Sequence, residues 1–216
     1  MASASFGCLQ KTVREIEKAG VDYIHFDIED GVFVPIMNLG TKIINDLRLL
    51  TNLPFDVHLM MVNPEWIIPQ LKSYGIDRVS FHHEATQYPR RLLKKIFELG
   101  MKGGIALNPK TSIPDIRYLQ PYLSFVVLLT TEPEGENCPF LPSVLSKMEI
   151  LKQMDEKKEL EYVVDGGISK ENVGDVIKVG ADFIVVGRSA FKDGRVIENI
   201  EELRNEIERT QPCKKI

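Results

Sequence analysis

The 216-residue chain has few cysteines and no long run of apolar residues. Its three cysteines, Cys8, Cys138 and Cys213, lie far apart and form no C-x-x-C pair. This spacing argues against a disulfide framework or a thiolate metal site, and it favours a reducing, cytoplasmic location. The first residues lack the charged and apolar regions of a secretory signal, and no run of about 18 apolar residues follows. We therefore expect neither secretion nor a membrane span.

The chain also lacks an excess of positive charge. Its 27 Lys and Arg are outnumbered by 31 Asp and Glu, which gives a formal net charge of −4. Without a broad basic field we expect no binding to nucleic acid, although a local basic pocket could still accept an anionic metabolite. A hydrophobic content of 44% is enough for one sizeable core. We therefore expect residues 1–216 to form a single domain.

Short apolar runs alternate with amphipathic stretches along the chain. Seven apolar runs predict strands, over residues 22–28, 55–61, 77–83, 102–108, 123–129, 160–165 and 182–187. Helical patterns lie between them, for example over residues 8–20, 64–75, 88–100, 143–154 and 170–180. Each strand is thus expected to be followed by a crossover helix.

Repeated strand–helix units predict a parallel sheet with right-handed crossovers. Eight such units in a chain of this length favour a (β/α)8 barrel, the TIM barrel, and an open parallel sheet is the alternative. Before the helical pattern over residues 8–20, only MASAS, residues 1–5, is available for a strand. The first of the eight strands is therefore predicted to be short or clipped.

The first strong strand pattern carries unusually many polar residues, in the sequence IHFDIEDG. His25, Asp27 and Glu29 are two residues apart, so a strand points them to one face and the apolar residues between them to the other. The apolar face would pack on helices. The polar face would then look into the barrel near the carboxyl end of the strand, where TIM barrels hold their active sites.

Two other predicted strands repeat this feature. Asp56, His58 and Met60 share one face of the strand over 55–61, and Asp165 ends the strand over 160–165. Burying ionisable groups costs several kcal/mol each unless they pair or bind a cation. Each residue alone could be an ordinary hydrogen-bonded strand end, and that is the role we expect for His82, His83 and Glu84.

Taken together, four of these residues favour a shared ligand. Imidazoles and carboxylates suit a divalent metal such as zinc, iron, manganese or cobalt. The predicted metal ligands are His25, Asp27, His58 and Asp165.

The loops after the last two predicted strands are rich in glycine. Gly166 and Gly167 follow the strand over 160–165, and Gly187, Arg188 and Ser189 follow the strand over 182–187. TIM barrels often bind phosphate in these two loops, where backbone N–H groups at helix starts face an anion. Glycine pairs by themselves usually mark only turns. Beside the metal ligands, these five residues are predicted to bind an anionic substrate group.

Six segments resemble, in order, the motifs of the ribulose-phosphate 3-epimerase family: IHFDIEDGVFVP, FDVHLMMVNPE, FHHEA, GIALNPKT, VVDGGI and GADFIVVGRSAF. The resemblance covers almost the whole chain and implies a ribulose-phosphate-binding TIM barrel. It further implies a metal-dependent isomerase of the pentose phosphate pathway, which inverts C3 of a ketose phosphate and interconverts ribulose 5-phosphate and xylulose 5-phosphate.

The resemblance also implies roles for single residues. Asp27 and Asp165 match the acid/base pair that transfers protons through an enediolate, and Met60 matches a methionine near the substrate. Such chemistry needs no nicotinamide or flavin. The family resemblance is also compatible with a homo-oligomer.

The chain departs from the family pattern at several positions. Glu29 stands where the family usually has a methionine; it could bind a substrate hydroxyl, raise a neighbouring pKa or ligate the metal, or be an exposed rim carboxylate. The loop over 130–140 keeps only Gly135 of the family's glycines, while Glu134 and Glu136 would repel phosphate. The family's opening P-S-x-L motif is absent from the sequence.

These departures keep two alternatives open. The first is the same chemistry on another ketose phosphate, such as a hexulose 6-phosphate. The second, of another class, is a non-catalytic sugar-phosphate-binding barrel.

Overall fold

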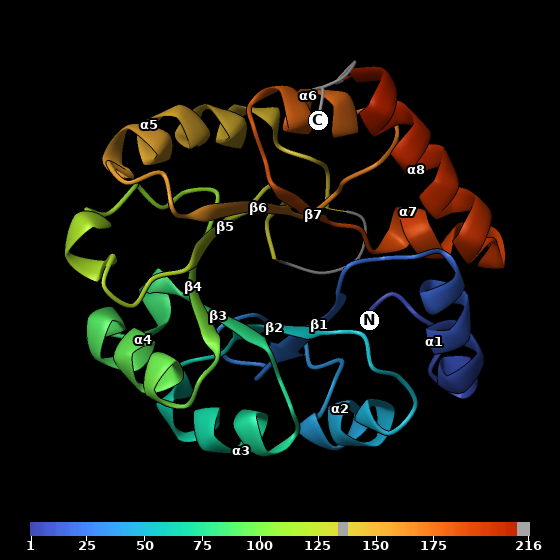
Figure 1. Cartoon of the computed structure of the whole chain (residues 1–216), viewed down its shortest axis with the longest axis horizontal. Helices are drawn as coiled ribbons and strands as arrows, with labels where there is room; N and C mark the ends of the chain where they lie inside the picture. The colour runs from blue at the N-terminus through green and yellow to red at the C-terminus, as the bar shows by residue number, and fades with distance from the viewer. Residues whose placement is uncertain (134–137, 211–216) are drawn as a thin grey trace.

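Seven parallel strands form one curled sheet in the computed structural model, which describes residues 1–133 and 138–210 (Figure 1). The strands are β1 (Ile24–Glu29), β2 (Phe55–Met60), β3 (Arg78–His82), β4 (Lys102–Leu107), β5 (Phe125–Leu129), β6 (Glu161–Asp165) and β7 (Phe183–Val185). Their order in the sheet is their order in the sequence. This order excludes a doubly wound open sheet, in which the strand order reverses, and it confirms the predicted barrel architecture.

The helices surround the outside of the curled sheet (Figure 1). They are α1 (Leu9–Lys18), α2 (Thr41–Arg48), α3 (Ile68–Ser73), α4 (Pro89–Glu98), α5 (Lys147–Met154), α6 (Val173–Lys178), α7 (Arg188–Phe191) and α8 (Val196–Thr210). The last of them, α8, packs against α1, α6 and α7. It thereby covers the side of the barrel where the two ends of the sheet face each other.

The connection from β4 to β5 differs from the prediction. A crossover helix was expected there, but the segment contains only a short 3-10 helix, Arg117–Leu119. Three prolines explain the difference, because Pro109, Pro114 and Pro121 each lack the backbone N–H that a helix interior requires. The statement that every strand is followed by an α-helix is therefore wrong at this position.

The ring of strands stays open between β1 and β7. In the part of the chain that the structure describes, β1 pairs only with β2, and β7 only with β6. No strand precedes β1 among those residues, and Phe6–Cys8 form a 3-10 helix instead. The predicted shortening of the first strand is thus confirmed as an incomplete barrel. The altered loop positions 134, 135 and 136 lie outside the described residues.

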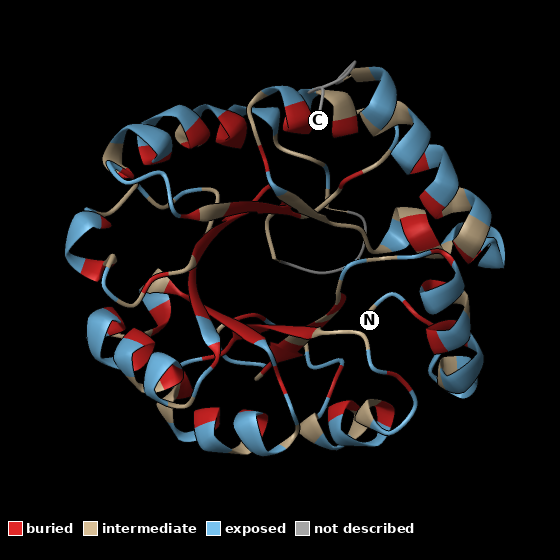
Figure 2. Cartoon of the chain, in the orientation of Figure 1, coloured by how far each residue is buried: buried red, intermediate tan, exposed pale blue. Residues whose placement is uncertain are grey.

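Two apolar clusters divide the core. The larger one fills the space between the strands and the helices, and Figure 2 shows it as buried segments on the inner sides of the helices and along the strands. The smaller one lies inside the ring and is formed by β4, β5, β6 and β7; its buried members are Ala106, Phe125, Val127 and Val163. The inside of the barrel is therefore apolar where these four residues pack, whereas β1, β2, β3 and the two ends of β6 carry polar residues there.

A buried arginine lies between the polar and the apolar parts of this interior. Arg78 of β3 is only 2% exposed, and its guanidinium carbon lies 4.1 Å from the centre of the Phe125 ring. Phe125 fits because Gly104, opposite it on β4, has no side chain; a Cβ atom there would overlap the phenyl ring.

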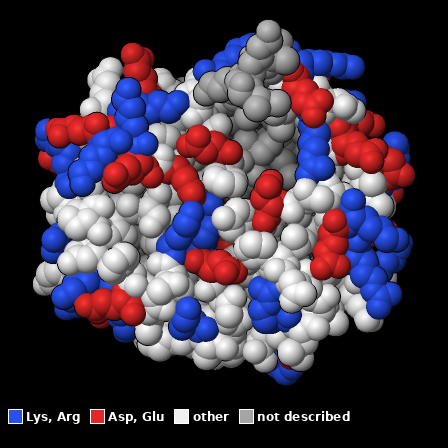
Figure 3. Space-filling view, in the orientation of Figure 1, with Lys and Arg blue, Asp and Glu red and all other residues white. Residues whose placement is uncertain are grey.

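The surface carries charges of both signs, interspersed over the face shown in Figure 3. Among the described residues, no helix is long and apolar enough to cross a membrane.

Replacing Gly104 by alanine should destabilise the fold by about 1–3 kcal/mol, because the added methyl group overlaps Phe125 in a closely packed interior. Urea unfolding measures this change. Gly7→Ala is the matched control, since nothing lies within 4 Å of its Cβ position, and it should change stability by less than about 0.5 kcal/mol. Equal stabilities of the two variants would contradict the packing argument.

Candidate functional site

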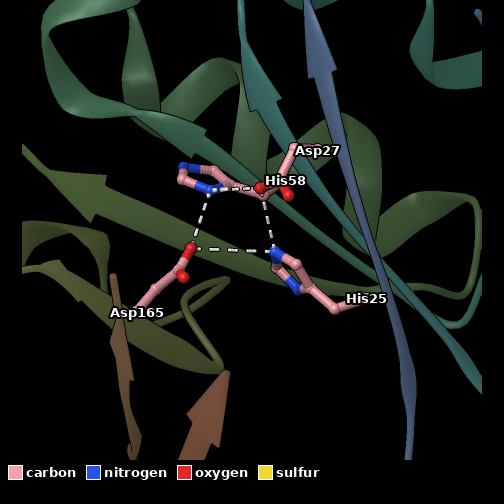
Figure 4. A group of neighbouring side chains, drawn as sticks. All are labelled: His25, Asp27, His58 and Asp165. Carbon is pink, nitrogen blue, oxygen red and sulfur yellow. Dashed lines mark hydrogen bonds and ion pairs between the residues drawn. The ribbon is translucent and has the colours of Figure 1, made fainter. Parts of the chain in front are cut away.

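Four ionisable side chains from three strands meet inside the curled sheet. His25 and Asp27 lie on β1, His58 on β2 and Asp165 at the end of β6, and Figure 4 shows the four pointing toward one another. One possible ligand atom from each residue lies within 4.8 Å of all the others. The strand alternation that predicted these residues thus brings all four together.

Imidazoles and carboxylates alternate around this cluster (Figure 4). His25 Nε2 lies 3.2 Å from Asp27 Oδ1 and 3.7 Å from Asp165 Oδ2. His58 Nδ1 lies 3.6 Å and 3.4 Å from the same two oxygens. Each histidine therefore faces both aspartates, and the two aspartates occupy opposite corners.

The chemistry of this cluster fits a divalent cation. Two neutral imidazoles with two carboxylates balance a charge of +2, and this set suits zinc, iron, cobalt or manganese. His58 is fully buried, yet its Nδ1 has no hydrogen-bond partner among the described residues. A buried nitrogen without a partner is unfavourable, and a metal ion at the centre of the cluster would satisfy it.

Without a metal, the two histidines hold protons. Burial lowers the pKa of His25, but the charge of Asp27 and the hydrogen bonds to Asp27 and Asp56 outweigh burial and raise its pKa to about 10. For His58, burial is likewise outweighed by Asp165 and Asp27, which raise its pKa to about 9. In the metal-free cluster, both histidines are therefore imidazolium ions at neutral pH.

The second nitrogen of each histidine also has a partner. His25 Nδ1 lies 2.8 Å from Asp56 Oδ2, and His58 Nε2 lies 3.0 Å from His82 Nε2. Burial lowers the pKa of His82 to about 4, so this residue is neutral and can accept a hydrogen bond from His58. Glu84 lies 3.4 Å from His82 Nδ1. The hydrogen-bonding role expected for His82 is thus confirmed.

Sequence reasoning assigned no role to Asp56. Strand alternation placed it on the same face as His58, but its contact with His25 depends on the register of β1 and β2, in which the two residues are direct neighbours. The sequence signal that could have indicated a role for Asp56 is the two-residue alternation of the strand, which places it on the same face as His58.

A cavity of about 690 Å³ adjoins the cluster, and His25, Asp27 and Asp165 form part of its wall. Its wall also includes apolar residues of the surrounding helices on the open side of the barrel, such as Ile16 of α1, Ile177 of α6 and Leu203 of α8, so only part of this volume adjoins the cluster. All five predicted anion-binding residues line it too: Gly166, Gly167, Gly187, Arg188 and Ser189. The structure therefore places the candidate metal ligands and the candidate phosphate loops around one cavity.

The loop after β6 requires its two glycines. Gly166 has a φ of +105° and Gly167 a φ of +69°, which side chains rarely allow. A Cβ atom at Gly166 would also lie 2.6 Å from the Thr131 hydroxyl. After β7, Arg188 donates a hydrogen bond to the Cys138 carbonyl at 3.0 Å, and the Ser189 hydroxyl donates to the Ile168 carbonyl at 2.5 Å.

Glu29 and Met60, two further predicted substrate contacts, are not part of the cavity wall. Both are only 6% exposed. The Glu29 carboxylate accepts hydrogen bonds from Asn38, from the backbone N–H at 2.9 Å and from the side-chain amide at 3.3 Å. Burial raises the pKa of Glu29. Glu29 is therefore not an exposed rim carboxylate, and it holds the loop after β1 instead of joining the four-residue cluster.

Comparison of the whole chain with known proteins identifies its family. The model of the ribulose-phosphate 3 epimerase family matches residues 1–191. The ribulose-phosphate 3-epimerase of Bacillus subtilis (strain 168) is 38% identical over 205 residues, which cover 94% of this chain and 94% of that protein. The chain belongs to the ribulose-phosphate 3-epimerase family. It is therefore an epimerase, an enzyme of the isomerase class.

Other relatives agree with this assignment. The ribulose-phosphate 3-epimerase of Synechocystis sp. is 36% identical over 207 residues, which cover 94% of this chain and 90% of that protein. Among solved structures, the 3-keto-L-gulonate-6-phosphate decarboxylase of Vibrio cholerae has a TM-score of 0.69. It is 16% identical, and the match covers 94% of this chain and 94% of that one. At this identity the likeness shows the shared barrel fold alone.

Binding of Zn²⁺ at pH 7 should release about two protons, because a metal ion binds neutral imidazole whereas both histidine pKa values lie above 7. For the same reason the affinity should rise as the pH is raised toward about 9. Titration calorimetry in two buffers of different ionisation enthalpy counts the released protons.

The variant His58→Gln removes a predicted metal ligand. It should therefore lower the Zn²⁺ affinity by more than the roughly 10- to 100-fold loss that is typical when only the hydrogen-bond partner of a ligand is removed. His83→Gln, a change outside the cluster, should bind as the unchanged protein does. Binding without proton release, or unaltered binding by His58→Gln, would argue against this ligand set.

Proposed function

We propose that this chain interconverts ribulose 5-phosphate and xylulose 5-phosphate by inverting C3, with Asp27 and Asp165 as the acid/base pair and a divalent metal held by His25, Asp27, His58 and Asp165. The observation that carries this proposal is the alternating cluster beside a cavity that the predicted anion-binding residues also line. Membership of the ribulose-phosphate 3-epimerase family supports the same reaction.

Inversion of C3 requires a base on one face of the carbon and an acid on the other. Asp27 and Asp165 lie at opposite corners of the cluster, on β1 and β6, and both border the cavity. One carboxylate removes the C3 proton and leaves an enediolate, and the other carboxylic acid returns a proton to the opposite face. Reversal of the two roles carries the reaction in the other direction.

The histidines hold the site between these two aspartates. His25 and His58 each contact both carboxylates, so they fix the distance between acid and base as well as supplying metal ligands. When bound, a divalent metal supplies Lewis-acid stabilisation of the negative charge that develops on the substrate oxygens. Because the strands restrict these side chains, the groups are arranged before the substrate enters.

The phosphate of the substrate would occupy the other part of the cavity. Gly166 and Gly167 lack side chains there, so that backbone N–H groups can approach an anion closely. Arg188 is the charged side chain among the predicted anion-binding residues, and its exposed guanidinium can pair with a phosphate. The distance between the metal-ligand cluster and the anion-binding residues would then set the length of the sugar that the site accepts.

The reaction is tested in D₂O with metal-reconstituted protein and ribulose 5-phosphate. NMR should show deuterium entering at C3 together with the formation of xylulose 5-phosphate. Asp27→Asn and Asp165→Asn should each lower the rate by roughly 10²- to 10⁴-fold, because each removes a proton-transfer group. Asp46→Asn, the same change on the exposed face of α2, is the matched control and should keep the full rate.

A hexulose 6-phosphate is the second substrate in this assay. A faster reaction with the hexulose would replace the proposed substrate by the longer sugar. The absence of exchange with both sugars, despite bound metal, would reject an epimerase activity and favour a non-catalytic sugar-phosphate-binding barrel.

Arg188→Ala should raise the KM for ribulose 5-phosphate roughly tenfold with little change in kcat, because it removes a contact to a part of the substrate that does not react. Steady-state kinetics separate the two constants. Arg195→Ala serves as the control, because Arg195 pairs with Glu202 and is not part of the cavity wall. A loss confined to kcat would contradict the assignment of Arg188 to the phosphate.

A further inference from the structure

We propose that Asp56 is a positioning residue that fixes the tautomer and orientation of His25 for metal binding. The inference rests on the metal site of the proposed function. Asp56 itself does not belong to the four-residue cluster, and it acts through His25.

The contact between Asp56 and His25 is short and largely buried, at the wall of the cavity. Asp56 Oδ2 lies 2.8 Å from His25 Nδ1, and the two side chains are 8% and 12% exposed. The residues are direct neighbours across the parallel pair β1 and β2, so the backbone register holds them together. Both ends of the hydrogen bond are thus carried by the rigid part of the fold.

This contact selects one form of the imidazole. A carboxylate accepts a hydrogen bond, so Nδ1 of His25 must carry the hydrogen, and the lone pair of a neutral ring then lies on Nε2. Nε2 is the atom that faces Asp27 and Asp165. Carboxylates that accept from the outer nitrogen of a ligating histidine orient the ring and raise its basicity as a ligand. Asp56 has this position relative to His25.

Asp56 is itself held from the other side by Arg78. Arg78 Nε lies 3.5 Å from Asp56 Oδ1, and Arg78 Nη1 lies 3.0 Å from Glu161 Oε2. The rings of Tyr23, Phe125 and Phe183 surround the guanidinium at 4.1–4.8 Å. With aromatic rings around it and a carboxylate on each side, the arginine has little freedom to move away from Asp56.

A purely structural role for Asp56 makes a different prediction. If Asp56 only neutralised Arg78, its loss would lower stability and leave metal binding unchanged. Glu161 offers the comparison, because it also pairs with Arg78 but makes no hydrogen bond to His25. Asp56→Asn and Glu161→Gln therefore remove the same charge from the two sides of one arginine.

The experiment measures Zn²⁺ affinity by competition with a chromophoric chelator, and the visible spectrum of the Co²⁺ form. Asp56→Asn should bind Zn²⁺ roughly 10- to 100-fold more weakly, as expected when the outer partner of a ligating histidine is lost. Its Co²⁺ spectrum should change as well. Glu161→Gln should retain the original affinity and spectrum. Unchanged Zn²⁺ binding and an unchanged spectrum in folded Asp56→Asn would overturn the proposal.

A second variant covers the case in which Asp56→Asn does not fold. The double variant Asp56→Asn with Arg78→Met removes the buried cation and one of its two carboxylate partners, while Glu161 keeps its ion pair with Lys102 at 2.7 Å; removal of a buried pair is often neutral for stability. Its Zn²⁺ affinity should still fall, and the original affinity would overturn the proposal. Metal binding by the unchanged protein without any epimerase activity would reject the proposed function alone, because the affinity comparison is independent of turnover.

Discussion

The ionisable groups inside the ring of strands are stable there only as a mutually compensating set. Asp27 and Asp165 face His25 and His58, while Asp56 lies between His25 and Arg78. An unpaired charge in this interior would cost several kcal/mol, so each group depends on the position of its neighbours. The cluster and the core beneath it are therefore one unit, and the register of the strands determines the geometry of both.

The interior of the barrel combines this polar set with an apolar filling. The inward residues of β4, β5 and β7 at the level of the cluster are apolar, as Ala106, Val127 and Val185 illustrate. β6 belongs to both parts, since Val163 packs in the apolar cluster and Asp165 ends the same face of the strand. One strand thus positions a candidate catalytic carboxylate directly above apolar packing. An environment of this kind restricts the side chain and limits its access to water.

The sequence predicted the fold and the cluster well because both depend on local periodicity. Alternation along a strand identified His25, Asp27 and His58 as inward residues, and the position of Asp165 at the end of another predicted strand linked it to them. The partners of these residues were not predictable, because the Asp56–His25 contact requires a register and the Glu29–Asn38 contact requires the conformation of a loop. The prolines between β4 and β5 are a sequence signal against a helix there, but the prediction gave more weight to the strand–helix repeat.

Gly104 and Phe125 share one space inside the barrel, since the aromatic ring occupies the volume that a side chain on β4 would need. The same ring covers the guanidinium of Arg78, which in turn contacts Asp56. The fold thus constrains the combined volume of the two positions. A larger residue at position 104 would be tolerated only with a smaller one at 125, and that exchange would uncover the arginine. Substitutions at these two sites are therefore expected to be epistatic, with consequences that extend to the metal ligands.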